Sequence, residues 1–173
     1  MLLYSKESSA NVLDGFECGV QKMDSFIHES LDTFLKNDPR YSFFVAKEEQ
    51  DIVAMFIVSG GMFVDHDGEF DDIPFGKPWG YMGEDFKMHS GMMYPTLELD
   101  YLAVRKDLRK KGYGSEIVKE LSRMARSKGC FFLTVDAYHD KDYSAIPFYE
   151  KCGFFALQEF SEEYDSLRMA YRV

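Results

Sequence analysis

The residues with the clearest chemical meaning in this chain are six consecutive ones: Arg109, Lys110, Lys111, Gly112, Tyr113 and Gly114. They lie between an apolar run at 97–104, which predicts a strand, and an amphipathic run from Ser115, which predicts a helix. Two glycines permit a tight turn that directs backbone N–H groups toward one point at a helix N-terminus, and three basic side chains add positive charge. We therefore expect a seat for phosphate oxygens and a cofactor that carries them.

The loop differs from the common nucleotide-binding motifs. Position 117 is Ile where a dinucleotide fingerprint has a third small residue, so a Rossmann fold is disfavoured. The sequence has no G-x-x-x-x-G-K-[ST] run and no H-R-D or D-F-G triplet, which removes support for nucleotide hydrolysis and for phosphoryl transfer.

A second segment, together with the glycine loop, makes the sequence pattern specific to fewer classes of protein. Residues 143–154 read Y-S-A-I-P-F-Y-E-K-C-G-F. This stretch resembles the A-x-x-F-Y-x-x-x-G-F signature that closes the core of the GNAT N-acetyltransferase superfamily, and the strand, R-x-x-G-x-G and helix resemble its acetyl-CoA pyrophosphate loop. The resemblance covers roughly residues 41–173. It implies one α/β domain spanning 1–173, a mixed sheet of six or seven strands with helices on both faces, and acetyl-CoA as co-substrate without a metal.

The resemblance also implies which residues contact acetyl-CoA. In GNAT folds the strand equivalent to 97–104 is bulged and splays from its neighbour, so that Leu102, Ala103 and Val104 would hold the pantetheine arm. From the sequence itself, the apolar positions change parity from 97 and 99 to 102 and 104, which an extra residue near Asp100 or Tyr101 would produce. The remaining implied contacts are Arg109, Lys110, Lys111, Gly112, Tyr113, Gly114, Ser115, Asp142, Ser144 and Tyr149.

Acetyl transfer to an amine needs a destination for the amine proton and a proton for the leaving thiolate. The F-Y pair of the closing motif sets a phenol against the cofactor sulfur in many GNAT proteins, which makes Tyr149 the candidate general acid. A phenol with a pKa of about 10 can donate at neutral pH. Glu98 and Asp100, on the strand that should line the cleft, are candidate bases, with bulk solvent as the alternative. We treat His139 as a solvated loop residue.

Two alternatives to acetylation of a small amine stay open. Phe16-Glu17-Cys18-Gly19, followed by Met23-Asp24-Ser25-Phe26-Ile27, is similar to the F-x-C-G-x-x-x-L-D-x-F-L opening of GNAT toxins that acetylate aminoacyl-tRNA and are held by an antitoxin. The acidic composition and a long insertion at 60–95 depart from that pattern. The other alternative is a non-catalytic acetyl-CoA-binding module that kept the loop and lost turnover.

The distribution of charge along the chain bears on which molecules it can bind. The chain carries a net charge of −10, yet nine Lys or Arg stand against three acidic residues between positions 105 and 128. Positive charge therefore gathers at the proposed cofactor loop, while an acidic body would repel nucleic acid over most of its surface. A small-molecule or peptide amine suits such a body, and a homodimer is compatible with it. A direct transfer is expected, because no cysteine has an evident activating base beside it.

Other features exclude some classes of protein. The three cysteines form no C-x-x-C pair, so neither a disulfide framework nor a zinc cluster is indicated. No run approaches the ~20 apolar residues that cross a bilayer, which predicts a cytoplasmic protein without a membrane partner. Five acids at 65–72 fit a solvated loop better than a cation site, because their spacing does not match an EF-hand. Trp79 is expected to pack the insertion onto the body.

Periodicity predicts the remaining elements. Apolar residues at steps of three and four indicate a helix within 11–37, and two β-rich runs at 42–47 and 52–59 indicate a hairpin. Residues 60–95 are expected to form an inserted loop. A helix should follow the cofactor loop with Ile117, Val118, Leu121, Met124 and Ala125 on its buried face and end at Gly129. The run 131–135 predicts a strand covered on both faces, and 154–157 with 167–171 a closing hairpin.

Overall fold

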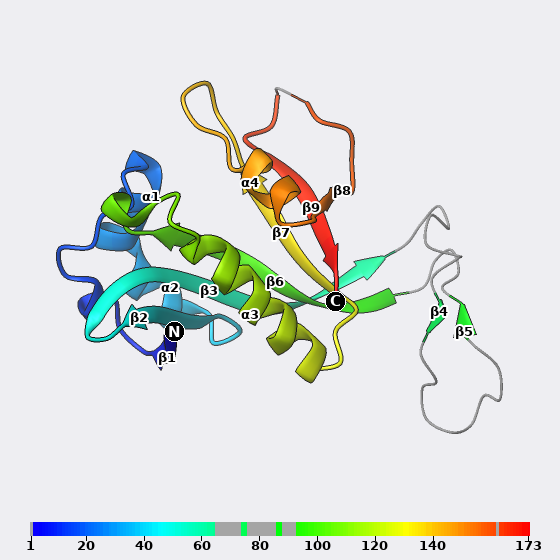
Figure 1. Cartoon of the computed structure of the whole chain (residues 1–173), viewed down its shortest axis with the longest axis horizontal. Helices are drawn as coiled ribbons and strands as arrows, with labels where there is room; N and C mark the ends of the chain where they lie inside the picture. Colours follow the sequence, from blue (N-terminus) through cyan, green and yellow to red (C-terminus); the bar gives the residue numbers. More distant parts are fainter. Residues whose placement is uncertain (1, 65–73, 76–85, 88–92, 162) are drawn as a thin grey trace.

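A seven-stranded mixed sheet lies between two layers of helices (Figure 1). This computed structural model describes residues 2–64, 74–75, 86–87, 93–161 and 163–173. The sheet has the strand order β1-β2-β3-β6-β7-β9-β8, in which only the β6–β7 pair is parallel. The fold class expected from the sequence, with six or seven strands and helices on both faces, is confirmed.

The elements follow one another along the chain in this order: β1 (Leu3–Glu7), η1 (Ala10–Leu13), α1 (Gln21–Ser25), η2 (Phe26–Ser30), α2 (Leu31–Asn37), β2 (Ser42–Glu48), β3 (Asp51–Val64), β4 (Pro74–Phe75), β5 (Phe86–Lys87), β6 (Met93–Val104), η3 (Lys106–Leu108), α3 (Tyr113–Ser127), β7 (Phe132–Tyr138), α4 (Ile146–Lys151), β8 (Phe155–Ala156) and β9 (Ser166–Arg172). The short strands β4 and β5 pair only with each other among the described residues.

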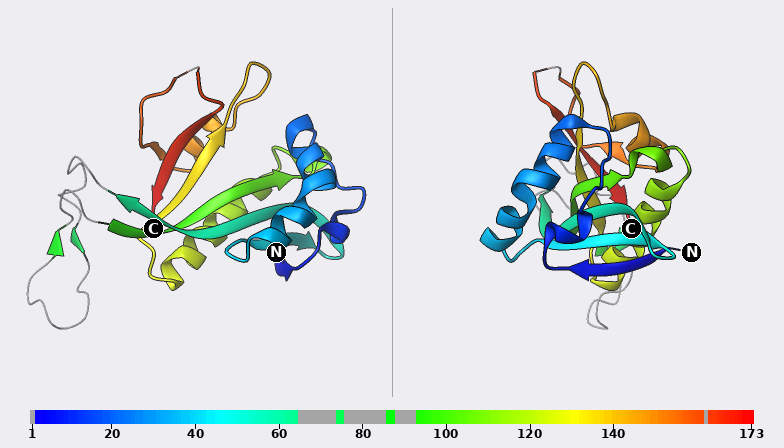
Figure 2. Two further views of the ribbon diagram at one scale, coloured as in Figure 1. Left: turned by 180° about the vertical axis from the view of Figure 1, so that it is seen from behind. Right: turned by 90° about the vertical axis from the view of Figure 1, so that its left-hand side faces the viewer.

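The two faces of the sheet bury separate apolar cores. Helix α3 covers one face, where Ile117, Val118, Leu121 and Ala125 are buried against the strands, and α4 packs on the same side. Segments α1, η2 and α2 cover the other face, as the end-on view in Figure 2 shows. Burying one such side chain stabilises the fold by about 1.5–3 kcal/mol. The predicted face of α3 is confirmed, with Met124 partly buried at its edge, and Gly129 follows the helix with a φ of 72°.

The N-terminal helical region is more broken than its periodicity predicts. Residues 10–13 form a separate 3₁₀ turn, and helix resumes only at Gln21, continuing through the π-helical η2 into α2. Gly15 and Gly19 lie between these pieces with φ of 71° and 78°, a left-handed conformation that interrupts a helix. The prediction of helix within 11–37 is therefore confirmed only from Gln21 onward.

The insertion is shorter than predicted, because both flanking strands extend into it. Residues 60–64 of β3 pair with 93–97 of β6, so the prediction of a loop was wrong at these positions. Gly61 suggests a loop in the sequence, but it lies in β3 and pairs with Thr96. A Cβ at this position would lie 2.1 Å from Glu98 Oε1, so the glycine makes room for that carboxylate. The five acids at 65–72, Trp79, His66 and His89 lie outside the described residues.

Strands β6 and β7 pair at one end and diverge at the other, as Figure 1 shows. Their parallel register covers only 96–99 of β6 against 132–135 of β7, although β6 continues to Val104 and β7 to Tyr138. On the β3 side, Ile57 pairs with Tyr101 and Val58 with Leu99, which leaves Asp100 as the extra residue of a bulge. The bulge predicted near Asp100 or Tyr101 is confirmed. The two strands thus enclose a wedge-shaped gap.

Candidate functional site

Backbone groups of β6 line the gap between β6 and β7. The Arg105 N–H donates to the Val53 carbonyl of β3 at 2.9 Å. Because bonding direction alternates along an antiparallel strand, the N–H and C=O groups of Leu102 and Val104 point away from β3 and into the gap. The backbone of Ala103 faces β3 instead, and its side chain is buried against the α1–α2 layer. Leu102 and Val104 thus present free polar groups to an extended ligand.

The cofactor loop leads directly into the N-terminus of α3. Its first intrahelical bond runs from the Glu116 N–H to the Gly112 carbonyl at 3.0 Å, so the N–H groups that precede Glu116 have no acceptor within the helix. Gly112 has a φ of 96°, and a Cβ built on it would meet no atom within 4 Å. Lys110 and Lys111 are exposed beside this turn. An exposed helix N-terminus with basic side chains beside it is an arrangement that suits phosphate oxygens.

Three segments of the chain meet at Gly114. A Cβ on this residue would lie 3.0 Å from Cζ of Phe148 in α4 and 3.8 Å from Cγ2 of Val104 in β6. Only glycine therefore lets the loop approach both neighbours. The adjacent Ser115 hydroxyl lies 3.7 Å from the Cys152 sulfur, and the Tyr113 hydroxyl donates to the Glu48 carboxylate. The two sequence motifs and the bulged strand thus form one site.

Tyr149 brings a phenol to this site from α4. Its ring is 6% exposed and packs edge-on against Phe148 and Phe154, with centroids 5.0 Å and 5.2 Å away. Within the described parts of the chain its hydroxyl has no hydrogen-bond partner. Burial, followed by the nearby Tyr143 and Cys152, raises the pKa of this phenol well above its usual value. The group therefore stays protonated at neutral pH and can act as a proton donor.

The two candidate bases on β6 differ in their surroundings. Glu98 Oε1 accepts a hydrogen bond from Arg168 Nη2 at 2.7 Å, and the same guanidinium binds Asp136 at 3.1 Å. Asp100 has a buried Oδ2 without a hydrogen-bond partner. Burial raises the pKa of Asp100 to about 6; the charge of Glu98 adds to this, while Ser59 and Arg168 oppose it. Among the described residues, Glu98 Oε1 is thus bound by Arg168, whereas the buried Oδ2 of Asp100 has no partner.

Arg168 is not among the site residues that the sequence predicts. It is the single charged residue inside the otherwise apolar run 167–171 of β9, and that isolation was the available signal. Its guanidinium joins β6, β7 and β9 through Glu98, Asp136 and the Thr134 hydroxyl, which lies 3.4 Å away. It thereby fixes the orientation of Glu98 below the gap.

The loop before α4 is held mainly by Asp140, a residue that the sequence did not single out. The Asp140 carboxylate accepts the N–H groups of Asp142 and Tyr143 at 2.8 and 2.7 Å, and the Ser144 hydroxyl accepts from Ile146 at 3.3 Å. The N-cap residue of α4 is Ala145, which has no side-chain cap, and Asp142 is exposed. His139 is buried, 8% exposed against the Phe160 ring, so its prediction as a solvated residue was wrong.

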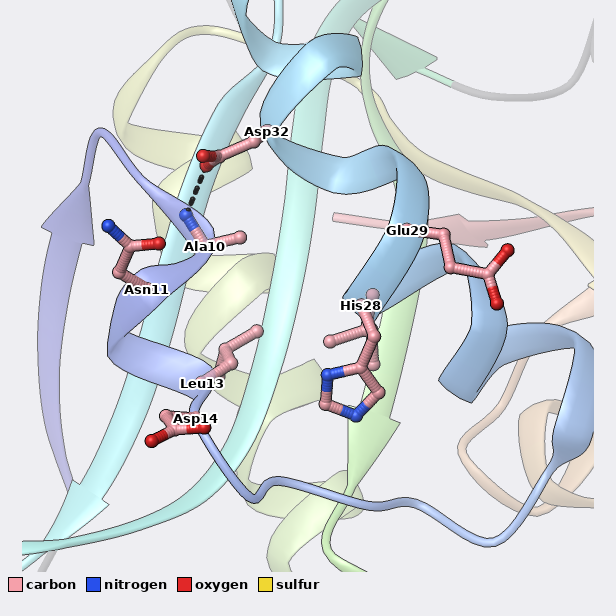
Figure 3. A pocket seen from close by; sticks show the side chains of 8 residues that line it. Ala10, Asn11, Leu13, Asp14, His28, Glu29 and Asp32 are labelled. Carbon is pink, nitrogen blue, oxygen red and sulfur yellow. Dashed lines mark hydrogen bonds between the residues drawn. The ribbon is translucent and has the colours of Figure 1, made fainter.

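A surface pocket of about 360 Å³ lies elsewhere, between η1 and the η2–α2 helical segment (Figure 3). Its described lining residues all come from positions 10–32. Asp32 is engaged by the Ala10 N–H at 2.6 Å, and the His28 ring bonds the Phe16 carbonyl at 2.9 Å. None of the predicted site residues lines this pocket, so it is separate from the gap.

Comparisons with known proteins agree with this geometry. The acetyltransferase (GNAT) family profile matches residues 13–154, and the chain belongs to this family. No curated protein sequence matches significantly. Among solved structures, the KacTA–DNA complex aligns with a TM-score of 0.63 at 19% identity, covering 99% of this chain and 93% of that one. AtaTR bound with acetyl-CoA aligns at 0.61 and 18% (98% and 93%), and AtaT complexed with acetyl-methionyl-tRNAfMet at 0.62 and 18% (97% and 94%). At these identities the likeness shows the fold.

Among the residues that the structure describes, no group of three or more His, Cys, Asp or Glu side chains is placed to hold a metal ion. No described helix has the length and apolar character that crossing a membrane requires.

Proposed function

We propose that this chain is an acetyl-CoA-dependent N-acetyltransferase that acts on a primary amine. The observation that carries the proposal is the meeting of the two motifs and the bulged strand at Gly114. There the free N–H groups of the loop can hold the diphosphate, Leu102 and Val104 can hold the pantetheine arm, and Tyr149 lies next to Phe148. The loop residues 109–115, with Ser144 and Asp142 nearby, complete the proposed cofactor contacts.

The transfer proceeds by direct attack. The neutral amine nitrogen forms a bond to the thioester carbonyl carbon, the carbon–sulfur bond breaks, and the departing thiolate takes a proton from the Tyr149 hydroxyl. We assign the amine proton to Asp100, directly or through water, because its Oδ2 has no hydrogen-bond partner among the described residues, whereas Glu98 Oε1 is bound by Arg168. With a pKa of about 6, Asp100 is mostly ionised at neutral pH.

The cysteines support direct transfer over an acetyl-cysteine intermediate. Burial raises the pKa of Cys18 to about 11 and also raises that of Cys130, so both stay protonated thiols. The Cys152 sulfur is near the Ser115 hydroxyl, which is a poor base. A cysteine nucleophile needs a lowered pKa or an adjacent base. Cys18 and Cys130 have raised pKa values, and the described contact of Cys152 with Ser115 supplies no base.

An acceptor screen with detection of free thiol tests the proposal. Acetyl-CoA is offered with polyamines, amino acids, peptides and aminoacyl-tRNA, and one class should accelerate thiol release well above hydrolysis. Saturable binding of acetyl-CoA without acceleration by any class would instead favour a non-catalytic binding module.

Acetylation of aminoacyl-tRNA is the second candidate. AtaT, which shares the fold, is solved in complex with acetyl-methionyl-tRNAfMet, and residues 16–27 of this chain resemble the opening of the toxins. The net charge of −10 weighs toward a small cationic amine, since phosphate backbones are repelled by an acidic surface. Thiol release that requires the tRNA moiety, and is absent with the free amino acid, would decide for the tRNA.

A further inference from the structure

The turn at residues 16–19 precedes α1 and lies against the segment that leads into the cofactor loop. The Glu17 carbonyl accepts the Lys106 N–H at 2.9 Å, and the Glu17 carboxylate pairs with the Lys106 ammonium. Phe16 and Cys18 are buried in the core of the α1–α2 layer, with 4% and 2% exposure. The turn is therefore anchored on one side and bonded to residue 106 on the other.

Asp24 fixes the shape of this turn. Its two carboxylate oxygens accept the N–H groups of Cys18 at 2.7 Å and Gly19 at 3.0 Å. Burial opposes ionisation, but these hydrogen bonds lower the pKa of Asp24 below its ordinary value, so the carboxylate is charged at neutral pH. Asp24 sits within α1, whose N-terminal turn thus holds the backbone of residues 18 and 19.

Gly19 brings the turn into contact with the basic residues of the loop. It has a φ of 78°, and a Cβ on it would lie 3.3 Å from Cβ of Lys106 and 3.9 Å from Nη1 of Arg109. The Arg109 guanidinium also lies over the Tyr143 ring, 5.4 Å from its centroid. Arg109 thus has both the glycine turn and an aromatic ring as neighbours. A long side chain held in this way loses less conformational entropy when it binds an anion.

We infer that residues 16–19, braced by Asp24 and bonded to Lys106, are a positioning element that holds Arg109 for the diphosphate of acetyl-CoA. The inference rests on the proposed function and adds a role that the loop motif alone does not contain. Gly19 and Asp24 act through Arg109 and do not touch the cofactor themselves. Their contribution depends on the diphosphate, so it disappears with a substrate that lacks one.

The test compares two thioesters with matched variants. Gly19→Ala and Asp24→Asn should raise the Kd of acetyl-CoA, measured by calorimetry, by about tenfold, the size of one weakened charge-assisted contact. The same variants should keep kcat/KM for S-acetylpantetheine, which has no diphosphate, within about twofold of wild type. A purely structural defect would lower the activity with both thioesters.

Two controls separate this role from general strain. Gly15→Ala introduces the same left-handed strain at a φ of 71°, but a Cβ there meets no atom within 4 Å. Asp32→Asn weakens the hydrogen bond that the Asp32 carboxylate accepts from the Ala10 N–H in the same layer. Both should leave the Kd of acetyl-CoA unchanged. Equal effects in variants and controls, or equal losses with both thioesters, would overturn this inference alone. Failure of the wild type to bind acetyl-CoA would overturn the proposed function with it.

Discussion

The side chain with the most direct proposed role in chemistry is Tyr149. Its hydroxyl is the only group that distinguishes it from phenylalanine, and its ring is fixed by Phe148 and Phe154. Tyr149→Phe should therefore keep the packing and the Kd of acetyl-CoA while lowering kcat by about 10²-fold, the usual contribution of a general acid. Steady-state kinetics with thiol detection measures this. An unchanged kcat would show that the phenol only packs in the aromatic core.

Asp100 gives the reaction a pH dependence. Its carboxylate must be ionised to accept a proton, and its pKa is raised to about 6. The value of kcat/KM should therefore rise as the pH increases through about 6. In Asp100→Asn this rise should be absent, and the rate should be lower by about 10²-fold. If the variant still shows the rise, another group is responsible for it.

Stability should change in the opposite direction with pH. The folded-state pKa of Asp100 lies above the unfolded value near 3.9, so the native state binds the proton more tightly and loses stability as pH rises from about 4 to about 6. Asp100→Asn removes this loss. Its melting temperature should exceed that of wild type by more at pH 7.5 than at pH 4.5, and the reverse order would contradict the burial of this carboxylate.

The sequence motifs predict candidate residues for the site but not the bonding among them. The glycines, Tyr149 and the acids of β6 are recognisable because backbone conformation and chemistry restrict their residue types. Arg168, Tyr143 and Asp140 could not be found in this way. Their roles depend on which strands and loops come together in space. For Arg168, the isolated charge in an apolar run is a signal, but it does not reveal the partners Glu98 and Asp136.

At the scale of elements, Gly114 is where loop, strand and helix must fit together. Gly114→Ala places a methyl group 3.0 Å from the Phe148 ring and should destabilise the fold by about 1–3 kcal/mol, as overpacking does. Thermal or urea unfolding measures the change. The smaller side chain in Gly114→Ala/Phe148→Leu should recover part of the loss. Additive destabilisation in the double variant would contradict this contact.

Elements with strong local signals were predicted well. Periodicity located α3 and the β2–β3 hairpin, and the change of parity located the bulge, because each depends on neighbours within one element. Two predictions failed for long-range reasons. Residues 60–64 contain two glycines and resemble a loop, but pairing with β6 keeps them in a strand. The helix expected from residue 11 is interrupted at the left-handed Gly15 and Gly19, and Asp24 holds the turn at 18 and 19, contacts that periodicity does not reveal.

At the scale of the whole molecule, the divergence of β6 and β7 separates two bodies that the site must bridge (Figure 2). Strands β1–β3 and β6 with α3 form one side, and β7–β9 with α4 the other. The described contacts across the opening include Gly114 against Phe148, Arg109 over Tyr143 and the ion pair between Lys22 and Asp165 at 2.8 Å. The last is exposed and contributes little stability. A ligand in the gap would join both sides.

A titration of the amide-labelled protein with acetyl-CoA, followed by NMR, tests the central claim most directly. Backbone signals of residues 109–115 and of Leu102 and Val104 should shift together and saturate below millimolar concentration, because their N–H groups become donors to the diphosphate and the pantetheine arm. Folded protein whose spectrum does not saturate at millimolar acetyl-CoA, or whose shifts cluster away from these residues, would contradict the account.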